Sequence, residues 1–273
     1  MITQNIFTMK KLTLLASAAM IVLTTSCDKK TTTTTPTTTP TTPTSTTPTP
    51  PSPTPTASDL YGGLVSIKME YNSQPTGSPI PVTLNTEMAS AFFNVTPGGT
   101  TFADAGTVSV NTYNLDKATN NAYTKMAMVG QTPSSLDFGS GSSAKSAWTV
   151  GGSGSVAGFS YSHNVSFPDY SGTLPSSITK SSGVSFTFNS GSLTGADSVI
   201  VFIASGNTSF TKTYAANAGS VTISASDLSA LTAVSDNSAL LEVCPYKYNF
   251  VTLNSKKYVF IKEQAVVKNI NIN

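Results

Sequence analysis

Side chains that could do chemistry are few in this sequence and lie far apart. His163 is the only histidine, and Asp169 and many serines lie close enough in sequence for a Ser-His-Asp arrangement. That arrangement usually holds its serine on a sharp turn, as in Gly-x-Ser-x-Gly between a strand and a helix. Residues 152–155 (Gly-Ser-Gly-Ser) do not provide one. We therefore expect His163 to be an ordinary loop or strand residue and the chain not to be an enzyme.

Metal and cofactor sites are not indicated either. Zinc needs clustered cysteine or histidine ligands, and the folded part offers one of each, His163 and Cys244. Calcium sites commonly use closely spaced carboxylates, whereas no two acidic residues here lie within two positions of each other. No phosphate-binding Gly-x-x-x-x-Gly-Lys loop is present. We expect no cofactor, although carbonyl-rich calcium sites and carboxylates that meet only in space stay open.

Two local concentrations of aromatic residues are the remaining candidates for a contact surface. Phe167 and Tyr170 form the first, and Tyr246, Tyr248 and Phe250 form the second. Aromatic rings displayed in loops or on a sheet face can stack on sugars, but more often they fill a core. We predict both groups to lie in loops, as candidate contact residues, with core packing as the alternative.

The N-terminus has the three parts of an export signal. Lys10 and Lys11 are followed by an apolar run, Leu12–Thr24, and then by small residues before Cys27. The run is shorter than the ~20 residues that a membrane-spanning helix needs. We therefore expect residues 1–26 to be a signal peptide that is removed in front of Cys27.

The segment Leu23–Cys27 resembles the lipobox of bacterial lipoproteins in a relaxed form, with leucine four residues before the cysteine instead of three. The resemblance implies acyl chains of the palmitate type on Cys27 and a membrane anchor. The charged residues Asp28–Lys30 resemble the surface-export signal of Bacteroidota-type lipoproteins, which implies the cell surface side of the outer membrane. A periplasm-facing lipoprotein is the alternative.

Residues 27–57 are predicted to form a linker without a core. Positions 31–56 hold 16 Thr, 8 Pro and 2 Ser, and proline-rich segments favour extended polyproline II. At ~3.1 Å per residue the segment could span roughly 80 Å. A spacer of this reach would hold a domain away from the membrane, and glycosylation of its threonines stays open.

Charge excludes one class of partner. All 15 basic residues are lysines, and 13 Asp and Glu oppose them. Without Lys10 and Lys11 the two signs balance. Nucleic-acid binding needs a basic stripe, usually with arginine, so we expect no nucleic-acid partner.

From residue 58 onward, period-two alternation and turn residues predict an all-β chain. We expect one or two immunoglobulin-like β-sandwich domains, and the Gly/Ser-rich segment Gly139–Ser143 suggests a division into a β domain over 58–143 and an immunoglobulin-like β-sandwich over 144–273. One short helix is expected at Ser226–Leu231, and Cys244 is expected to be a buried apolar residue. This region also resembles uncharacterised Bacteroidota-type surface lipoproteins.

These features together indicate a membrane-anchored envelope lipoprotein that binds a glycan or protein ligand without catalysis. The alternative is a structural or accessory envelope protein. An exposed aromatic patch would favour binding, whereas an unpaired apolar edge strand would favour assembly.

Overall fold

The computed structural model describes residues 58–73, 82–188 and 191–273. The predicted signal peptide, Cys27 and the Thr/Pro-rich linker lie outside these ranges. Within them the protein is an all-β sandwich, as the alternating pattern predicts. A short helix and two 3₁₀ turns are the helical elements of this described part: α2 (Ala225–Leu228), η1 (Gly141–Ser143) and η2 (Ala216–Ala218).

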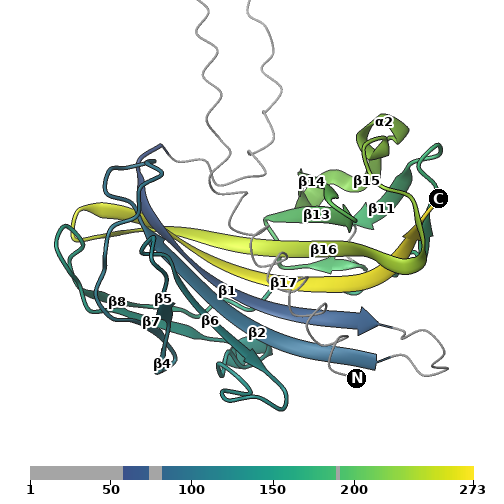
Figure 1. Cartoon of the computed structure of the whole chain (residues 1–273). Coiled ribbons are helices and arrows are strands. Elements are labelled where there is room, and N and C mark those ends of the chain that lie inside the picture. The colour runs from purple at the N-terminus through teal and green to yellow at the C-terminus, as the bar shows by residue number, and fades with distance from the viewer. Residues whose placement is uncertain (1–57, 74–81, 189–190) are drawn as a thin grey trace, which may run out of the picture.

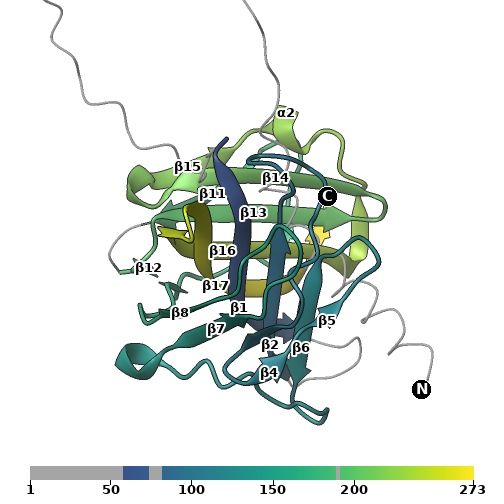
Figure 2. The same cartoon turned by 90° about the vertical axis from the view of Figure 1, so that its left-hand side faces the viewer.

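A nine-stranded sheet forms the frame of the molecule (Figure 1). Its long central strands lie side by side although they are far apart in sequence. β10 (Ser177–Ile178) pairs with the C-terminal end of the last of these strands, at Asn271 and Ile272. Figure 2 shows β13 crossing β1 and β2 at a steep angle, which is the accumulated twist of a large sheet. In order across the sheet the strands are β14 (Thr208–Ala215), β13 (Ser198–Ser205), β16 (Val234–Leu253), β17 (Lys256–Ile272), β1 (Leu60–Ser73), β2 (Val82–Phe93), β6 (Tyr123–Met128) and β5 (Asp116–Lys117).

The two ranges expected to be separate domains share this sheet. β1 pairs in parallel with β17, from Leu60 opposite Lys257 to Asn72 opposite Lys268. Strands from 144–273 are spread over four sheets, and β7 (Ser146–Val150) pairs with β3 (Val108–Val110) from the other side of Ala144. The boundary near Ala144 therefore does not separate two sheets.

The longest hairpin of the molecule joins β16 to β17. Its two turn residues, Asn254 and Ser255, have φ angles of 49° and 61°. Two successive residues in the left-handed region give the type of two-residue turn whose twist matches that of paired strands. The turn thereby sets a register that runs from Leu253 opposite Lys256 to Val234 opposite Ile272.

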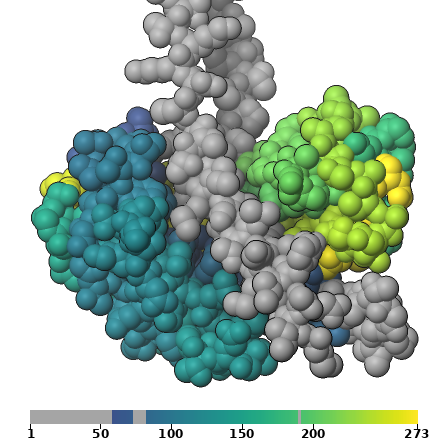
Figure 3. Space-filling view, in the orientation of Figure 1, coloured from purple at the N-terminus to yellow at the C-terminus, as the bar shows by residue number. Residues whose placement is uncertain are grey.

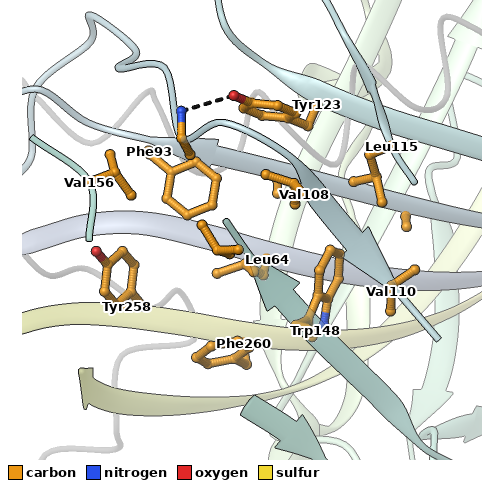
Figure 4. Close-up of a cluster of buried hydrophobic side chains, with 14 of the residues drawn as sticks. Leu64, Phe93, Val108, Val110, Leu115, Tyr123, Trp148, Val156, Tyr258 and Phe260 are labelled. Atoms are coloured by element: carbon orange, nitrogen blue, oxygen red, sulfur yellow. Dashed lines mark hydrogen bonds between the residues drawn. The ribbon is translucent and has the colours of Figure 1, made fainter. Parts of the chain in front are cut away.

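Smaller sheets cover one face of the large sheet, which we call the covered face. At one end lies a four-stranded sheet of β4 (Tyr113–Asn114), β3, β7 and β8 (Phe159–His163). Trp148, Phe93 and Tyr258 are at most 1% exposed between the layers there, and Ala105 N donates to Tyr123 Oη at 2.9 Å (Figure 4).

A second cluster occupies the other end of the covered face. It lies under two small sheets and includes Leu228 of α2. The helix begins with a capping box in which the side chains of Ser224 and Asp227 each accept a hydrogen bond from the other residue's backbone N–H. The helix lies within one residue of the start expected from sequence. Figure 3 shows the teal strands and the green strands as masses on opposite sides. The small sheets are β11 (Val184–Phe188) with β15 (Gly219–Ile223), and β9 (Asp169–Tyr170) with β12 (Leu193–Thr194).

Candidate functional site

The opposite face of the large sheet carries a third cluster of buried apolar side chains, and we call it the apolar face. Every member belongs to β1, β2, β13, β16 or β17, so the cluster contains no residue from another described element. Its fifteen buried members are at most 8% exposed, although no other described element packs against them. Its members are Leu60, Val65, Ile67, Met69, Met88, Ile200, Phe202, Ala204, Leu240, Cys244, Tyr246, Val259, Ile261, Ala265 and Val267, with Tyr71, Tyr248 and Phe250 packed against them.

Three of the predicted contact residues form one row on this face. Tyr246, Tyr248 and Phe250 alternate along β16, with ring centroids 6.1 Å and then 5.4 Å apart. The expectation that they lie in a loop is wrong, because this segment continues β16. Aromatic residues at every second position are typical of a strand with one apolar face. The row nevertheless lines the candidate surface.

The other two predicted contact residues lie elsewhere. Tyr170 is in the short strand β9 and is 5% exposed in the cluster under the small sheets. Phe167 is half-buried on the covered face, where Lys262 Nζ and Lys68 Nζ lie 4.7 and 5.1 Å from its ring centroid. Both rings pack inside the sandwich, so the structure does not bring them together with the β16 row.

Two carboxyl groups lie within the apolar face, and the sequence did not single them out. Glu242 is 6% exposed between Phe202 on β13 and Val267 on β17. Glu263 is 3% exposed between Tyr246 and Ile67. Each interrupts an apolar strand at a position that faces the same side as its apolar neighbours, and this is the signal that could have identified them.

Burial dominates the electrostatics of this carboxyl pair. It raises the pKa of Glu242 to about 8, and the nearby charge of Glu263 adds to the rise. It also raises the pKa of Glu263 to about 7, against the opposing effect of a hydrogen bond from Cys244. Desolvation disfavours the charged form of a carboxyl group. Glu242 is therefore held largely protonated in neutral solution, and Glu263 is close to half protonated.

Cys244 lies on β16 between the two glutamates. Its side chain is 2% exposed, which confirms the expected burial, and its Sγ donates to Glu263 Oε2 at 3.9 Å. Burial is the largest cause that raises the pKa of this thiol well above its ordinary value. A protonated, enclosed thiol is a poor nucleophile, so the site is better suited to holding a molecule than to attacking one.

His163 lies on the covered face, away from these residues. It is 1% exposed, and neither ring nitrogen has a hydrogen-bond partner within the described ranges. Burial is the main cause that lowers its pKa to about 4, with Lys262 and Lys247 adding to it. Asp169 instead accepts from Gln264 Nε2 at 2.9 Å. The structure therefore does not bring His163 and Asp169 into a hydrogen-bonded pair.

The described residues contain no group of three or more His, Cys, Asp or Glu side chains placed to hold a metal ion. No helix among them is long and apolar enough to cross a membrane.

The fold and the site define a class of protein: an all-β sandwich whose largest sheet has an apolar face with two buried carboxyl groups. Comparison with known proteins adds nothing to this description. No family model matches the chain, and no curated protein or solved structure matches it.

Proposed function

We propose that this chain is a lipid-anchored binding module of the cell envelope and that its apolar face holds an apolar small molecule. The observation that carries the proposal is a large cluster of apolar side chains formed by one face of a single sheet. Its buried members are at most 8% exposed without a described element over them, and burial of apolar surface is worth ~25 cal/mol per Å². The acyl chains expected on Cys27 would keep the module at a membrane, where apolar molecules are concentrated.

The position of this face favours a small molecule over a glycan or a protein. Its centre lies on the middle strands β16, β17 and β1, and the side chains there are aliphatic or aromatic. A glycan requires a dense set of hydrogen-bonding groups, whereas the face offers few beyond Glu242 and Glu263. Small-molecule sites are typically apolar with a few polar groups that fix orientation.

The alternative role in envelope structure is less well supported. Assembly through strand addition needs an apolar edge strand. The outermost strands in the described sheet order are β14, with Thr211 and Lys212, and the two-residue β5, with Asp116 and Lys117. Edge strands that are short or carry lysine pair poorly with a strand of another chain.

The test uses the exported chain carrying Cys27→Ala, which has no acyl chain of its own. We expect it to bind the neutral apolar dye N-phenyl-1-naphthylamine, with a rise in dye fluorescence. Ala265 lies at the centre of the face, between Cys244 and Met69. Ala265→Trp should fill the site and weaken dye binding about tenfold or more, and because Ala265 is buried, far-UV circular dichroism must show that the variant is folded.

Val129→Trp is the matched control, since Val129 is 73% exposed and away from the face. It adds the same indole ring at the surface and should leave dye binding unchanged. Equal dye affinity of the Ala265→Trp, Val129→Trp and parent chains would overturn the proposal, as would an absence of dye binding.

A further inference from the structure

His163 lies between the four-stranded sheet and the large sheet, next to aromatic rings from both layers. On its own strand β8, the ring of Tyr161 lies 6.3 Å from the ring of His163, centroid to centroid. Across the layers, the ring of Phe260 on β17 lies 6.4 Å away. Ser146 of β7 is opposite His163 in the strand register and is 0% exposed. A charge formed on this imidazole is therefore formed inside the sandwich.

Two lysines of the large sheet act on the charge of His163. Lys262 follows Phe260 on the same face of β17 and is 0% exposed. Lys247 is opposite Lys262 in the register of β16 with β17, so both side chains project from the covered face. Burial is the largest cause that lowers the pKa of His163 to about 4, and the charges of Lys262 and Lys247 add to it. A protonated imidazole here meets repulsion as well as desolvation.

Three carboxylates also belong to the elements around His163, and each has a partner of its own. They are Asp197 before β13, with Lys247 at 3.8 Å; Asp169 on β9, with Gln264 at 2.9 Å; and Glu87 on β2, with Lys68 of β1 at 4.0 Å. The polar neighbours that β7 and β8 contribute are uncharged: Ser146, Trp148 and Tyr161. The charges that dominate at His163 are therefore those of the two lysines.

β8 is the outer strand of its small sheet and is joined to the large sheet by side chains of the β16–β17 hairpin. In the described sheet order its one strand neighbour is β7. The hairpin donates Asn254 Nδ2 to Gly158 O at 3.1 Å, Asn249 Nδ2 to Tyr161 Oη at 2.9 Å, and Lys262 Nζ to Val165 O at 2.7 Å. The lysine that repels a charged His163 thus also holds the chain two residues beyond it.

We propose that His163 is an acid-operated release for β8. Protonation of the imidazole places a second cation beside Lys262, and β8 separates from the large sheet together with residues 164–168, so that the charge reaches water. The large sheet stays paired through the long ladders of β1, β16 and β17. Release exposes part of the cluster between the layers, including Phe260, whose ring lies 4.2 Å from that of Tyr161. This inference is independent of the function proposed for the apolar face.

The size of the effect follows from the two protonation equilibria of His163. With β8 closed its pKa is about 4, whereas a hydrated imidazole has the ordinary value of 6.5. A lowered pKa favours the closed state above pH 6.5, and this preference is lost as pH falls to 4, because the open state binds the proton first. The equilibrium constant for opening should therefore rise roughly a hundredfold from pH 7 to pH 4.

Hydrogen exchange detected by mass spectrometry measures this opening in the exported Cys27→Ala chain. Exchange rates at pH 7, 5.5 and 4 are divided by the intrinsic rates of the unfolded sequence. Amides of residues 159–168 should lose roughly a hundredfold of their protection from pH 7 to pH 4, and at pH 4 they should be less protected than those of β17. His163→Gln should remove this pH dependence. Adding Ser162→His to His163→Gln is the control: Ser162 is exposed on the same strand, so its replacement should not restore the dependence.

Several outcomes would overturn the release. Equal protection of residues 159–168 and of β17 at pH 4 would mean that the whole sandwich unfolds together. A pH dependence that persists in His163→Gln, or returns with Ser162→His, would assign it to other groups. The wild-type profile is sufficient if His163→Gln does not fold. As the only histidine, His163 also gives an unambiguous ring signal in NMR; a midpoint near pH 4 is expected, and one near pH 6.5 would refute its enclosure.

Discussion

Glu242→Gln should make the folded protein more stable, and the gain should grow with pH. Burial raises the pKa of Glu242 from 4.5 to about 8. A carboxyl group whose pKa is raised on folding makes its full contribution to the free energy of unfolding below pH 4.5, where it is protonated in both the folded and the unfolded chain. That contribution falls as pH rises to about 8, because the unfolded chain ionises first. Glutamine has nearly the same shape and does not ionise, so the variant should escape this loss.

The magnitude follows from the pKa difference. Each pKa unit corresponds to roughly 1.4 kcal/mol, so the wild-type penalty should be about 2 kcal/mol at pH 6 and at most about 5 kcal/mol above pH 8. Part of the rise comes from the charge of Glu263. The realised gain at pH 8 should therefore be about 3 kcal/mol, since Glu263 keeps its own penalty in the variant.

Urea unfolding measures this gain directly. Trp148 is the only tryptophan and is 1% exposed, so its fluorescence reports the loss of the core. Unfolding free energies of wild type and Glu242→Gln should be compared at intervals from pH 4 to pH 9, with Glu70→Gln as the control. A difference between Glu242→Gln and wild type that stays constant over this range would refute the burial argument.

Four further predictions follow from other residues. His163, with its pKa lowered to about 4, should contribute stability that is present above pH 6.5 and lost between pH 6.5 and 4. In His163→Leu the unfolding free energy measured in urea should therefore change less between pH 6.5 and 4, and an unchanged pH dependence would show that the ring is hydrated. Cys244→Ala should cost about 1–2 kcal/mol by lost burial, whereas rapid modification of the native thiol by a bulky maleimide would contradict its enclosure. Cys27 should incorporate a palmitate analogue in cells, and equal labelling of Cys27→Ala would disprove lipidation there. Protease added to intact cells should remove the folded part while periplasmic proteins survive, and its survival until the outer membrane is broken would assign it to the periplasm.

Local pattern was sufficient to predict the fold class. The eight residues of β13 are all buried, and their nearly continuous apolar run is typical of a strand covered on both faces. Alternation placed β11 and β7 in the same way. The extent of β16 was not predicted, because Pro245 and the residues around it read as a loop. Pro245 lies within a central strand, opposite Val199 of β13, where tertiary pairing overrides local preference.

The candidate site could be predicted only in part. Tyr246, Tyr248 and Phe250 drew attention because aromatic residues are common in contact surfaces, and they do line the apolar face. Glu242 and Glu263 were missed because 21 positions separate them, and acidic residues scattered along a chain usually face water. Only the pairing of β16 with β17 shows that both project from the same face. That pairing depends on the register of a long hairpin, which no short window of sequence contains.

The parallel pairing of β1 with β17 has a consequence for how the chain acquires its structure. The first described strand lies in the middle of the sheet, and its partner is the last strand, which ends at Ile272. During synthesis from the N-terminus, β1 can pair with β2 early, but its other edge stays open until β17 has emerged. Contacts between residues so distant in sequence form slowly. The middle of the large sheet is therefore completed only when β17 pairs on both sides, and disruption of β17 would open the sheet at its middle and not at its margin.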